Sequence, residues 1–339
     1  MYRRVVASSS LGLGESYMDG EWDVDQGRIS DFIGIILRNN LPESIRGNYS
    51  SMIRYLISRM LTSPRSLSRS RKNVEHHYDL SNGFYELMLD PSMTYSCGKK
   101  LHSDDTLEQM QDQKYANTCE KLDLRPGDRL VDIGCGWGGM LRYAARNHGV
   151  SGLGVTLSEE QRSWANDKIR ADDLASQIDC QLLDYRQVEG EFDKFVSIGM
   201  FEHVGQSQYP TFMRTARRLL KPGGLGLLHT IGNKVGGTDP WIDKYIFPGG
   251  HLPRLQQIRD EMHKADLSVL EEENWKYDYA DTLRLWKQNF DRHRDAIVAL
   301  DPDRFNEQFM RMWDYYLQSC EAGFRHGDSQ LYRILFRKQ

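Results

Sequence analysis

The chain has 339 residues, of which 39% are hydrophobic and 27% charged, with a formal net charge of −4. This length suits one large domain or two modest ones. The acidic balance argues against a nucleic-acid-binding protein. There is no apolar run of about 18 residues, the length that a membrane-spanning helix needs. The five cysteines are odd in number and lack C-x-x-C spacing, which predicts reduced thiols in a cytoplasmic protein and no metal site.

Residues 1–70 are expected to form a small helical domain that ends in a polar linker. The segment 43–61 repeats apolar residues at helical spacing. The block from Arg46 to Lys72 carries seven basic residues and no acidic one. It is either a solvated helix face with a linker or a surface that meets anionic lipid, where basic clusters gain ~1 kcal/mol per charge.

A cofactor loop is predicted where an apolar run meets a glycine cluster, in VDIGCGWGGMLRYAA from Val131 to Ala145. Glycines permit the tight turn between a strand and a helix and let the backbone approach a ligand closely. The free N–H groups at the start of the following helix then face that ligand. This pattern is typical of a nucleotide-cofactor site on an α/β sheet.

The glycine spacing also fits G-x-G-x-x-G, so an enzyme that binds a nicotinamide or flavin dinucleotide is one candidate. Such enzymes carry an acidic residue about 20 positions further on, at the end of the second strand, to bind a ribose. Here that strand, LGVTLS, ends at Thr156 and has no acidic residue in place. The dinucleotide hypothesis is therefore the weaker one.

S-adenosylmethionine is favoured by the residues around the loop. Asp132 stands directly before the first glycine, and Asp184 with Tyr185 follows a third apolar strand. EFDKFVSIGMFEH then predicts a fourth strand, and RRLLKPGGLGLLHTI predicts a helix, a Pro-Gly-Gly turn and a fifth strand. This order resembles the class I methyltransferase core, which implies a Rossmann-like α/β fold with a mostly parallel sheet.

After this core, TDPWIDKYIFPGGHLP is expected to form a cap over the site. The C-terminal third is expected to be mostly helical and rich in aromatic residues. It ends in QLYRILFRK, which predicts the antiparallel last strand of this fold.

Longer segments resemble the cyclopropane-fatty-acyl-phospholipid synthases, relatives of the mycolic acid cyclopropane synthases. The resemblance covers nearly the whole chain and is carried by LGESYMDGEWDVD, HHYDLSNGFYELMLDPSMTYSCG, VDIGCGWGG, GVTLSEEQ, SIGMFEHVG, KPGGLGLLHTIG, DPWIDKYIFPGG and YYLQSCEAGFR. It implies a catalytic domain that binds S-adenosylmethionine over residues 71–339. It also implies that the chain begins inside the small helical domain of the phospholipid-acting members.

The resemblance implies that a methyl group moves from S-adenosylmethionine to a cis double bond in a phospholipid acyl chain. The resulting carbocation loses a proton to a bound bicarbonate ion, and a cyclopropane closes. Water must be excluded, and aromatic faces can stabilise the cation. A related lipid methyltransferase with a methyl-branched, unsaturated or hydroxylated product is the alternative. A lipid-binding protein with a relic fold is disfavoured by the intact glycine loop.

The family's bicarbonate ligands correspond to the side chains of Glu202, His229 and Tyr279 and to the backbone N–H groups of Cys97 and Ile231. A protonated Glu202 or His229 is expected to donate to the ion, since two bare anions would repel. Cys320 matches a cysteine proposed as an active-site residue. A neutral cysteine on an aromatic helix is more often inert packing, so Cys320 is expected near the acyl pocket without a nucleophile's role.

Cofactor contacts are expected from Tyr95, Ser96, Asp132, Gly134, Gly136, Thr156, Gln161, Asp184, Tyr185 and Arg186. Thr156 and Gln161 would take over the ribose contacts that an acidic residue makes elsewhere. The expected partner is unsaturated phospholipid at the inner face of the cell membrane, reached through the basic block Arg46–Lys72. A homodimer is left open.

Overall fold

The structure is a computed structural model, which describes residues 1–39 and 80–339. The predicted helix 43–61, the basic block Arg46–Lys72 and the expected domain boundary near residue 70 lie outside these ranges. Within them, no helix is both long and apolar enough to cross a membrane.

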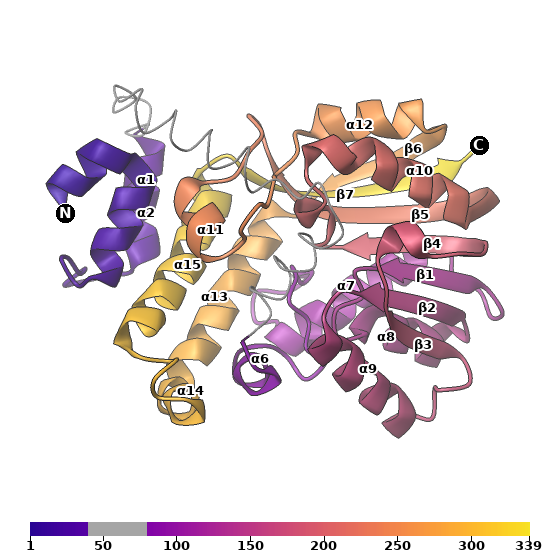
Figure 1. Cartoon of the computed structure of the whole chain (residues 1–339), viewed down its shortest axis with the longest axis horizontal. Helices are drawn as coiled ribbons and strands as arrows, with labels where there is room; N and C mark the ends of the chain where they lie inside the picture. The colour runs from indigo at the N-terminus through magenta and orange to yellow at the C-terminus, as the bar shows by residue number, and fades with distance from the viewer. Residues whose placement is uncertain (40–79) are drawn as a thin grey trace.

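A seven-stranded sheet in the order β3-β2-β1-β4-β5-β7-β6 forms the centre of the catalytic part (Figure 1). The strands are β1 (Arg129–Ile133), β2 (Ser151–Thr156), β3 (Ile178–Leu182), β4 (Phe192–Ile198), β5 (Leu220–Asn233), β6 (Leu267–Asn274) and β7 (Ser329–Lys338). β1 to β5 are parallel, and β7 runs antiparallel to both of its neighbours. The predicted class I methyltransferase fold, with its antiparallel last strand, is confirmed.

Helices cover both faces of the sheet, as parallel strands with apolar runs on both sides require (Figure 1). One face packs against α7 (Leu107–Lys121), α8 (Gly139–His148) and α9 (Glu159–Ala171). The other packs against α10 (Tyr209–Leu219) and α12 (Leu255–Lys264). Three short 3₁₀ turns follow strands or precede α10: η1 (Tyr185–Gln187), η2 (Phe201–His203) and η3 (Gln206–Gln208).

Two features of the sheet differ from the sequence prediction. The Pro-Gly-Gly segment does not stand before the fifth strand but lies inside β5, where Phe192 pairs with Leu220 and Lys194 with Leu225. Between these two pairs β5 moves on by five residues while β4 moves on by two, so the extra residues of β5 form a β-bulge. The sequence analysis also missed β6, because three consecutive glutamates interrupt its apolar pattern on the edge of the sheet.

A second helical layer stands beyond one end of the sheet (Figure 1). It contains α6 (Asn82–Met88), α11 (Pro240–Tyr245), α13 (Lys276–Arg292), α14 (Arg294–Leu300) and α15 (Glu307–His326), together with α1 (Tyr2–Met18) and α2 (Ile29–Arg38). These helices share one apolar core, in which Tyr17 and Ile33 pack with Trp241 and Trp313. The described N-terminal helices are therefore packed into the catalytic part.

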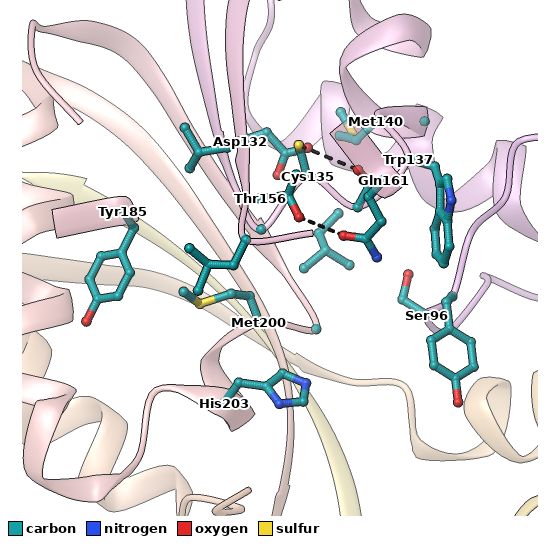
Figure 2. A pocket seen from close by; sticks show the side chains of 18 of the residues that line it. Ser96, Asp132, Cys135, Trp137, Met140, Thr156, Gln161, Tyr185, Met200 and His203 are labelled. Atoms are coloured by element: carbon teal, nitrogen blue, oxygen red, sulfur yellow. Dashed lines mark hydrogen bonds between the residues drawn. The ribbon is translucent and has the colours of Figure 1, made fainter. Parts of the chain in front are cut away.

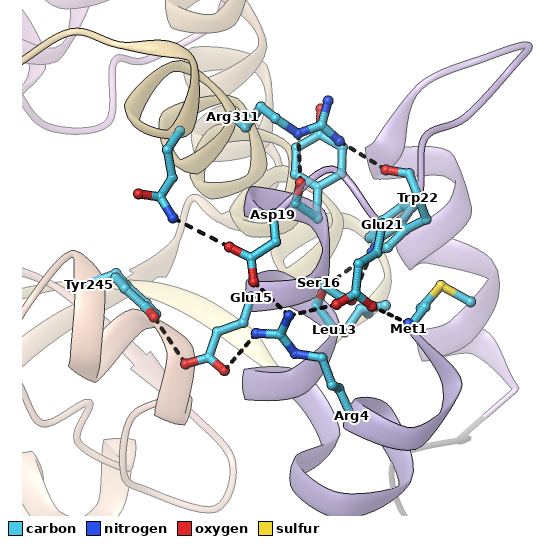
Figure 3. A network of polar contacts seen from close by, with 12 residues as sticks. Met1, Arg4, Leu13, Glu15, Ser16, Asp19, Glu21, Trp22, Tyr245 and Arg311 are labelled. Atoms are coloured by element: carbon cyan, nitrogen blue, oxygen red, sulfur yellow. Dashed lines mark hydrogen bonds and ion pairs between the residues drawn. The ribbon is translucent and has the colours of Figure 1, made fainter. Parts of the chain in front are cut away.

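The first helix is broken at Ser9, whose backbone has φ 48° and ψ −124°, and its second half folds back on the first. A Cβ on Gly12 would collide with the carbonyl oxygen of Arg4, so only glycine fits at this crossing. The Arg4 guanidinium joins the first half to Glu15 of the second half at 3.3 Å (Figure 3). It also lies 2.6 Å from Asp19 and 2.8 Å from Glu21, just beyond the end of α1.

Polar contacts also fix α1 to the catalytic part. The carboxylate of Glu15 accepts from the hydroxyl of Tyr245 at 2.9 Å (Figure 3). It also accepts from Lys244 at 2.6 Å, and both partners stand at the end of α11. Arg311 of α15 donates to the carbonyl oxygens of Tyr17 and Trp22. These bonds hold α1 where its apolar residues reach an internal cavity.

Candidate active site

The first of two adjoining cavities lies at the carboxyl ends of β1 to β4, where open α/β sheets bind their ligands. All ten residues expected to contact the cofactor line it: Tyr95, Ser96, Asp132, Gly134, Gly136, Thr156, Gln161, Asp184, Tyr185 and Arg186. Figure 2 shows several of these side chains converging from separate elements. We call this space the cofactor pocket.

Its floor is the glycine loop between β1 and α8. Gly134 and Gly136 have φ values of +82° and +54°, which side chains rarely permit. A Cβ on Gly134 would lie 2.5 Å from the Cβ of Met200, so that glycine serves packing. A Cβ on Gly136 would meet no atom within 4 Å and would project into open space. The loop thus has the form of a cradle for a closely bound ligand.

Polar groups stand around this cradle. Asp132 is 2% exposed, and burial raises its pKa to about 7, an effect that the nearby Lys114 opposes. The Thr156 hydroxyl donates to Gln161 Oε1 at 2.7 Å, which leaves the Gln161 amide hydrogens for another acceptor (Figure 2). Asp184 binds both the backbone N–H and the guanidinium of Arg186. The pocket therefore offers acceptors, donors and a glycine cradle, which fit S-adenosylmethionine.

The second cavity has a volume of about 420 Å³ and mostly apolar walls. Those walls include Leu13, Ile33, Ile36, Trp241, Ile242, Phe247, Tyr315 and Phe324, from α1, α2, the α11 region and α15. Glu202, Ile231, Tyr279 and Cys320 line the same space. We call it the acyl cavity. A cavity with such walls suits an apolar ligand, because it contains few groups that could bind a polar one.

The two cavities meet at Tyr95, Gly199 and His203, which line both. The hydroxyl of Tyr95 is 2.9 Å from that of Tyr316, and its ring lies 5.0 Å from that of Trp286. Burial lowers the pKa of His203 to about 4, so its imidazole is neutral at pH 7. Sequence reasoning missed His203, whose only signal was its position next to Glu202.

Glu202 lies on η2, four residues past the end of β4. β4 stops at Ile198, opposite His229, so Ile231 of β5 has no neighbour on β4, and its N–H donates to Glu202 Oε1 at 2.6 Å. Oε2 has no hydrogen-bond partner among the described residues. Burial raises the pKa of Glu202 to about 7, so the group can carry a proton near neutrality.

His229 is 1% exposed, and neither ring nitrogen has a partner among the residues that the structure describes. Burial lowers its pKa well below the usual value, and the cations of Arg333 and Lys114 add to this effect. Of the two expected proton carriers, burial therefore favours a protonated Glu202 and a neutral His229 imidazole, which carries a single N–H donor. Orphaned polar atoms on Glu202 and His229 fit a small bound anion such as bicarbonate.

The remaining predicted catalytic residues fall in different places. Tyr279 lines the acyl cavity, where its ring lies 4.6 Å from that of Phe324. Cys97 is fully buried, and its thiol donates to the carbonyl of Gly98. Neither Cys97 nor His229 lines the cofactor pocket or the acyl cavity. Cys320 faces the acyl cavity, and burial raises its pKa to about 12. Its thiol is thus protonated at pH 7, which agrees with inert packing.

Comparison with known proteins places the chain in a family. Residues 65–334 match the family described as "Mycolic acid cyclopropane synthetase". The chain belongs to this family. It is 41% identical to "Cyclopropane-fatty-acyl-phospholipid synthase" of Escherichia coli (strain K12) over 340 aligned residues, which cover 99% of this chain and 85% of that protein. As a cyclopropane synthetase family member, it is an S-adenosylmethionine-dependent methyltransferase.

Two solved structures agree with the family. The cyclopropane synthase MmaA2 from Mycobacterium tuberculosis aligns with a TM-score of 0.74 and 31% identity, over 79% of this chain and 98% of that one. The mycolic acid cyclopropane synthase CmaA1, in a complex with SAH and CTAB, gives the same TM-score, identity and coverage. Coclaurine N-methyltransferase, at 19% identity and a TM-score of 0.79, shares the fold over 96% of this chain and 99% of its own.

Proposed function

We propose that the enzyme converts a cis double bond in an unsaturated phospholipid acyl chain into a cyclopropane. The observation that carries this proposal is the junction of the two cavities. A polar pocket that fits S-adenosylmethionine and a long apolar cavity share Tyr95, Gly199 and His203. An alkene in the acyl cavity and a methyl donor in the cofactor pocket would meet at these residues, away from bulk water.

S-adenosylmethionine supplies an electrophilic methyl group on a sulfonium. The π electrons of the alkene form a bond to the methyl carbon, the carbon–sulfur bond breaks, and a neutral thioether leaves. A positive charge then stands on the second alkene carbon. Tyr95 lines the junction, where its ring can stabilise that charge without reacting with it, and Trp286 and Tyr316 hold Tyr95 in place from behind.

Ring closure requires the loss of a proton from the carbon that was transferred. The electrons of that C–H bond form the third bond of the ring, and a bicarbonate held near Glu202 and His229 would supply the base that accepts the proton. Glu202 would hold this ion through a protonated Oε2, while His229 would donate its single N–H. Tyr279 and the N–H group of Cys97 are the further proposed ligands. The N–H of Ile231, also expected to bind the ion, is instead donated to Glu202 Oε1 and orients that carboxyl group. This assignment rests on the orphaned atoms of Glu202 and His229.

The lipid would enter the acyl cavity from a membrane surface. Tyr2, Val6 and Ile35 on α1 and α2 are 80%, 66% and 52% exposed, and Tyr2 also lines the acyl cavity. Exposed apolar side chains beside an opening suit contact with a bilayer. The basic block Arg46–Lys72, which follows α2 in the chain, would add attraction to anionic lipid. We therefore propose a peripheral location at the inner face of the cell membrane.

The test is incubation with S-adenosylmethionine and vesicles of a phospholipid with one cis double bond, followed by mass spectrometry of the fatty acids. A gain of one CH₂ that resists catalytic hydrogenation supports the cyclopropane. A gain of one CH₂ that then takes up hydrogen indicates a methylidene product, and a hydroxylated chain indicates capture of the cation by water. Either of the last two outcomes would replace ring closure with the related lipid methyltransferase activity.

A further inference from the structure

Lys114 of α7 is a fully buried lysine that lines the cofactor pocket and has no role in the proposed reaction. Lysine is almost never buried without partners, because its amine loses strong hydration. Here Nζ donates to Ser96 Oγ at 2.9 Å and to Gln111 Oε1 at 2.7 Å. It also lies 4.6 Å from the centre of the Tyr115 ring.

These contacts converge on Ser96. Gln111 Nε2 donates to the carbonyl oxygen of Ser96 at 2.9 Å, so both the backbone and the side chain of Ser96 are held from α7. Lys114 and Gln111 are joined to each other as well. The segment from Met93 to Ser96, which forms one wall of the cofactor pocket, is thereby fixed to a helix that packs on the sheet.

The contact between Lys114 and Ser96 decides in which direction the Ser96 hydroxyl can donate its hydrogen. An ammonium group has donors but no acceptor, so Ser96 Oγ must accept from Lys114. The hydroxyl hydrogen must then be directed elsewhere, and Ser96 lines the pocket. Asp132, which lines the same pocket, is an acceptor when ionised. Among the polar groups of the pocket, Ser96 can therefore donate and ionised Asp132 can accept, which matches the carboxylate and the ammonium of an amino acid.

The charged form of Lys114 has support from its surroundings. Burial lowers the pKa of Lys114 to about 7, and Arg333 acts in the same direction. Asp90, Cys97 and Asp132 oppose this and favour the ammonium. An anion bound at Ser96 would favour it further, because opposite charges stabilise each other in a medium of low dielectric constant.

We propose that Lys114 is a positioning residue that turns the Ser96 hydroxyl toward the α-carboxylate of S-adenosylmethionine, while Asp132 takes the α-ammonium. Lys114 acts through Ser96 and does not touch the reacting atoms. The inference depends on the use of S-adenosylmethionine and is independent of the lipid product.

Calorimetry with two ligands tests this assignment. S-adenosylhomocysteine carries the amino-acid end, whereas 5′-methylthioadenosine has the same adenosine and thioether but lacks that end. Lys114→Met should weaken S-adenosylhomocysteine about 10- to 100-fold, the range for a hydrogen bond to a charged group. The affinity for 5′-methylthioadenosine should stay within about twofold. A parent enzyme that bound neither ligand would refute the cofactor assignment itself.

Variants at Ser96 keep the test valid where Lys114→Met fails to fold. Ser96→Ala should show the same selective loss of affinity for S-adenosylhomocysteine, and Ser96→Thr should retain the affinity because it keeps the hydroxyl. The double variant Lys114→Met/Ser96→Ala should bind no more weakly than the weaker of its two single variants. Lys121→Met, on the same helix but paired with Glu271 outside the pocket, is the matched control and should bind both ligands normally. Equal loss of both ligands in Ser96→Ala or Lys114→Met would overturn the proposal.

Discussion

The cofactor pocket and the acyl cavity share three lining residues but differ in the secondary structure and the polarity of their walls. The pocket lies on the rigid edge of the sheet, with two left-handed glycines and polar side chains fixed by hydrogen bonds. The acyl cavity lies among helices that are distant in sequence, and its walls are mostly apolar. Directed bonds recognise one ligand geometry, whereas apolar walls recognise length and shape.

Under the proposed function, this difference would let one enzyme recognise a polar cofactor in one cavity and a lipid tail in the other. It also implies that substitutions in the two regions should have separable effects. A change in the cofactor pocket should act on cofactor affinity, and a change in the acyl cavity should act on lipid turnover alone. Glu202, which lines the acyl cavity next to the boundary residue His203, should affect turnover without affecting either binding step strongly.

The largest expected effect is that of Gly136→Val. A side chain there would project into the cofactor pocket and would strain a backbone with φ +54°. We expect the affinity for S-adenosylhomocysteine to fall by more than about 100-fold in calorimetry, equivalent to the loss of roughly two strong contacts. Gly190→Val, at φ +93° with no neighbour within 4 Å, imposes similar strain away from the pocket and should bind normally. Normal affinity in a folded Gly136→Val variant would show that the glycine loop does not bind the cofactor.

Glu202→Gln should lower turnover by about 100-fold or more, the usual range for a group that supports proton transfer. Its amide keeps the shape of the side chain and can still accept from Ile231 and donate to the ion, but it cannot release or take up a proton as a carboxyl group can. Cofactor affinity, measured separately, should change less than about twofold. Restoration of turnover by added bicarbonate would support the bound ion directly, and near-normal turnover would make Glu202 a structural residue.

Cys320 allows a paired test of the acyl cavity. Cys320→Trp should reduce turnover more than about tenfold, because a large ring would fill space that the acyl chain needs. Cys320→Ser should keep turnover within about threefold, since a protonated thiol makes no covalent contribution. Cofactor affinity should be unchanged in both. A collapse of turnover in the serine variant would assign Cys320 a chemical role after all.

The smallest expected effect concerns pH and stability. Burial raises the pKa of Glu202 from 4.5 to about 7, so between these values the folded protein holds a proton that the unfolded chain has released. The free energy of unfolding should therefore fall as pH rises through this window, by up to ~3 kcal/mol from this group. Glu202→Gln removes that contribution. Thermal unfolding from pH 4.5 to 8 should show a weaker pH dependence in the variant, and identical profiles would mean that Glu202 ionises normally.

The sequence alone predicted most of the sheet and the position of the cofactor pocket. The loop around Gly134 and Gly136, Asp132 before it and Thr156 at the end of β2 are all encoded in short segments. Their patterns depend on local backbone requirements and on the periodicity of neighbouring residues, which a single sequence displays. The parallel strands then carry these residues to one edge, because consecutive βαβ units repeat the same direction.

Only the tertiary structure decided the rest, because it depends on packing between distant segments. The acyl cavity joins Leu13 and Ile33 to Trp241 and Cys320, and no local pattern predicts that meeting. The lowered pKa of His229 reflects burial and the cations of Arg333 and Lys114, from β7 and α7. Lys114 itself reads as an ordinary surface lysine in QDQKYANT. Only the folded protein places its amine next to Ser96 and Gln111 and close to the charges that shift its pKa.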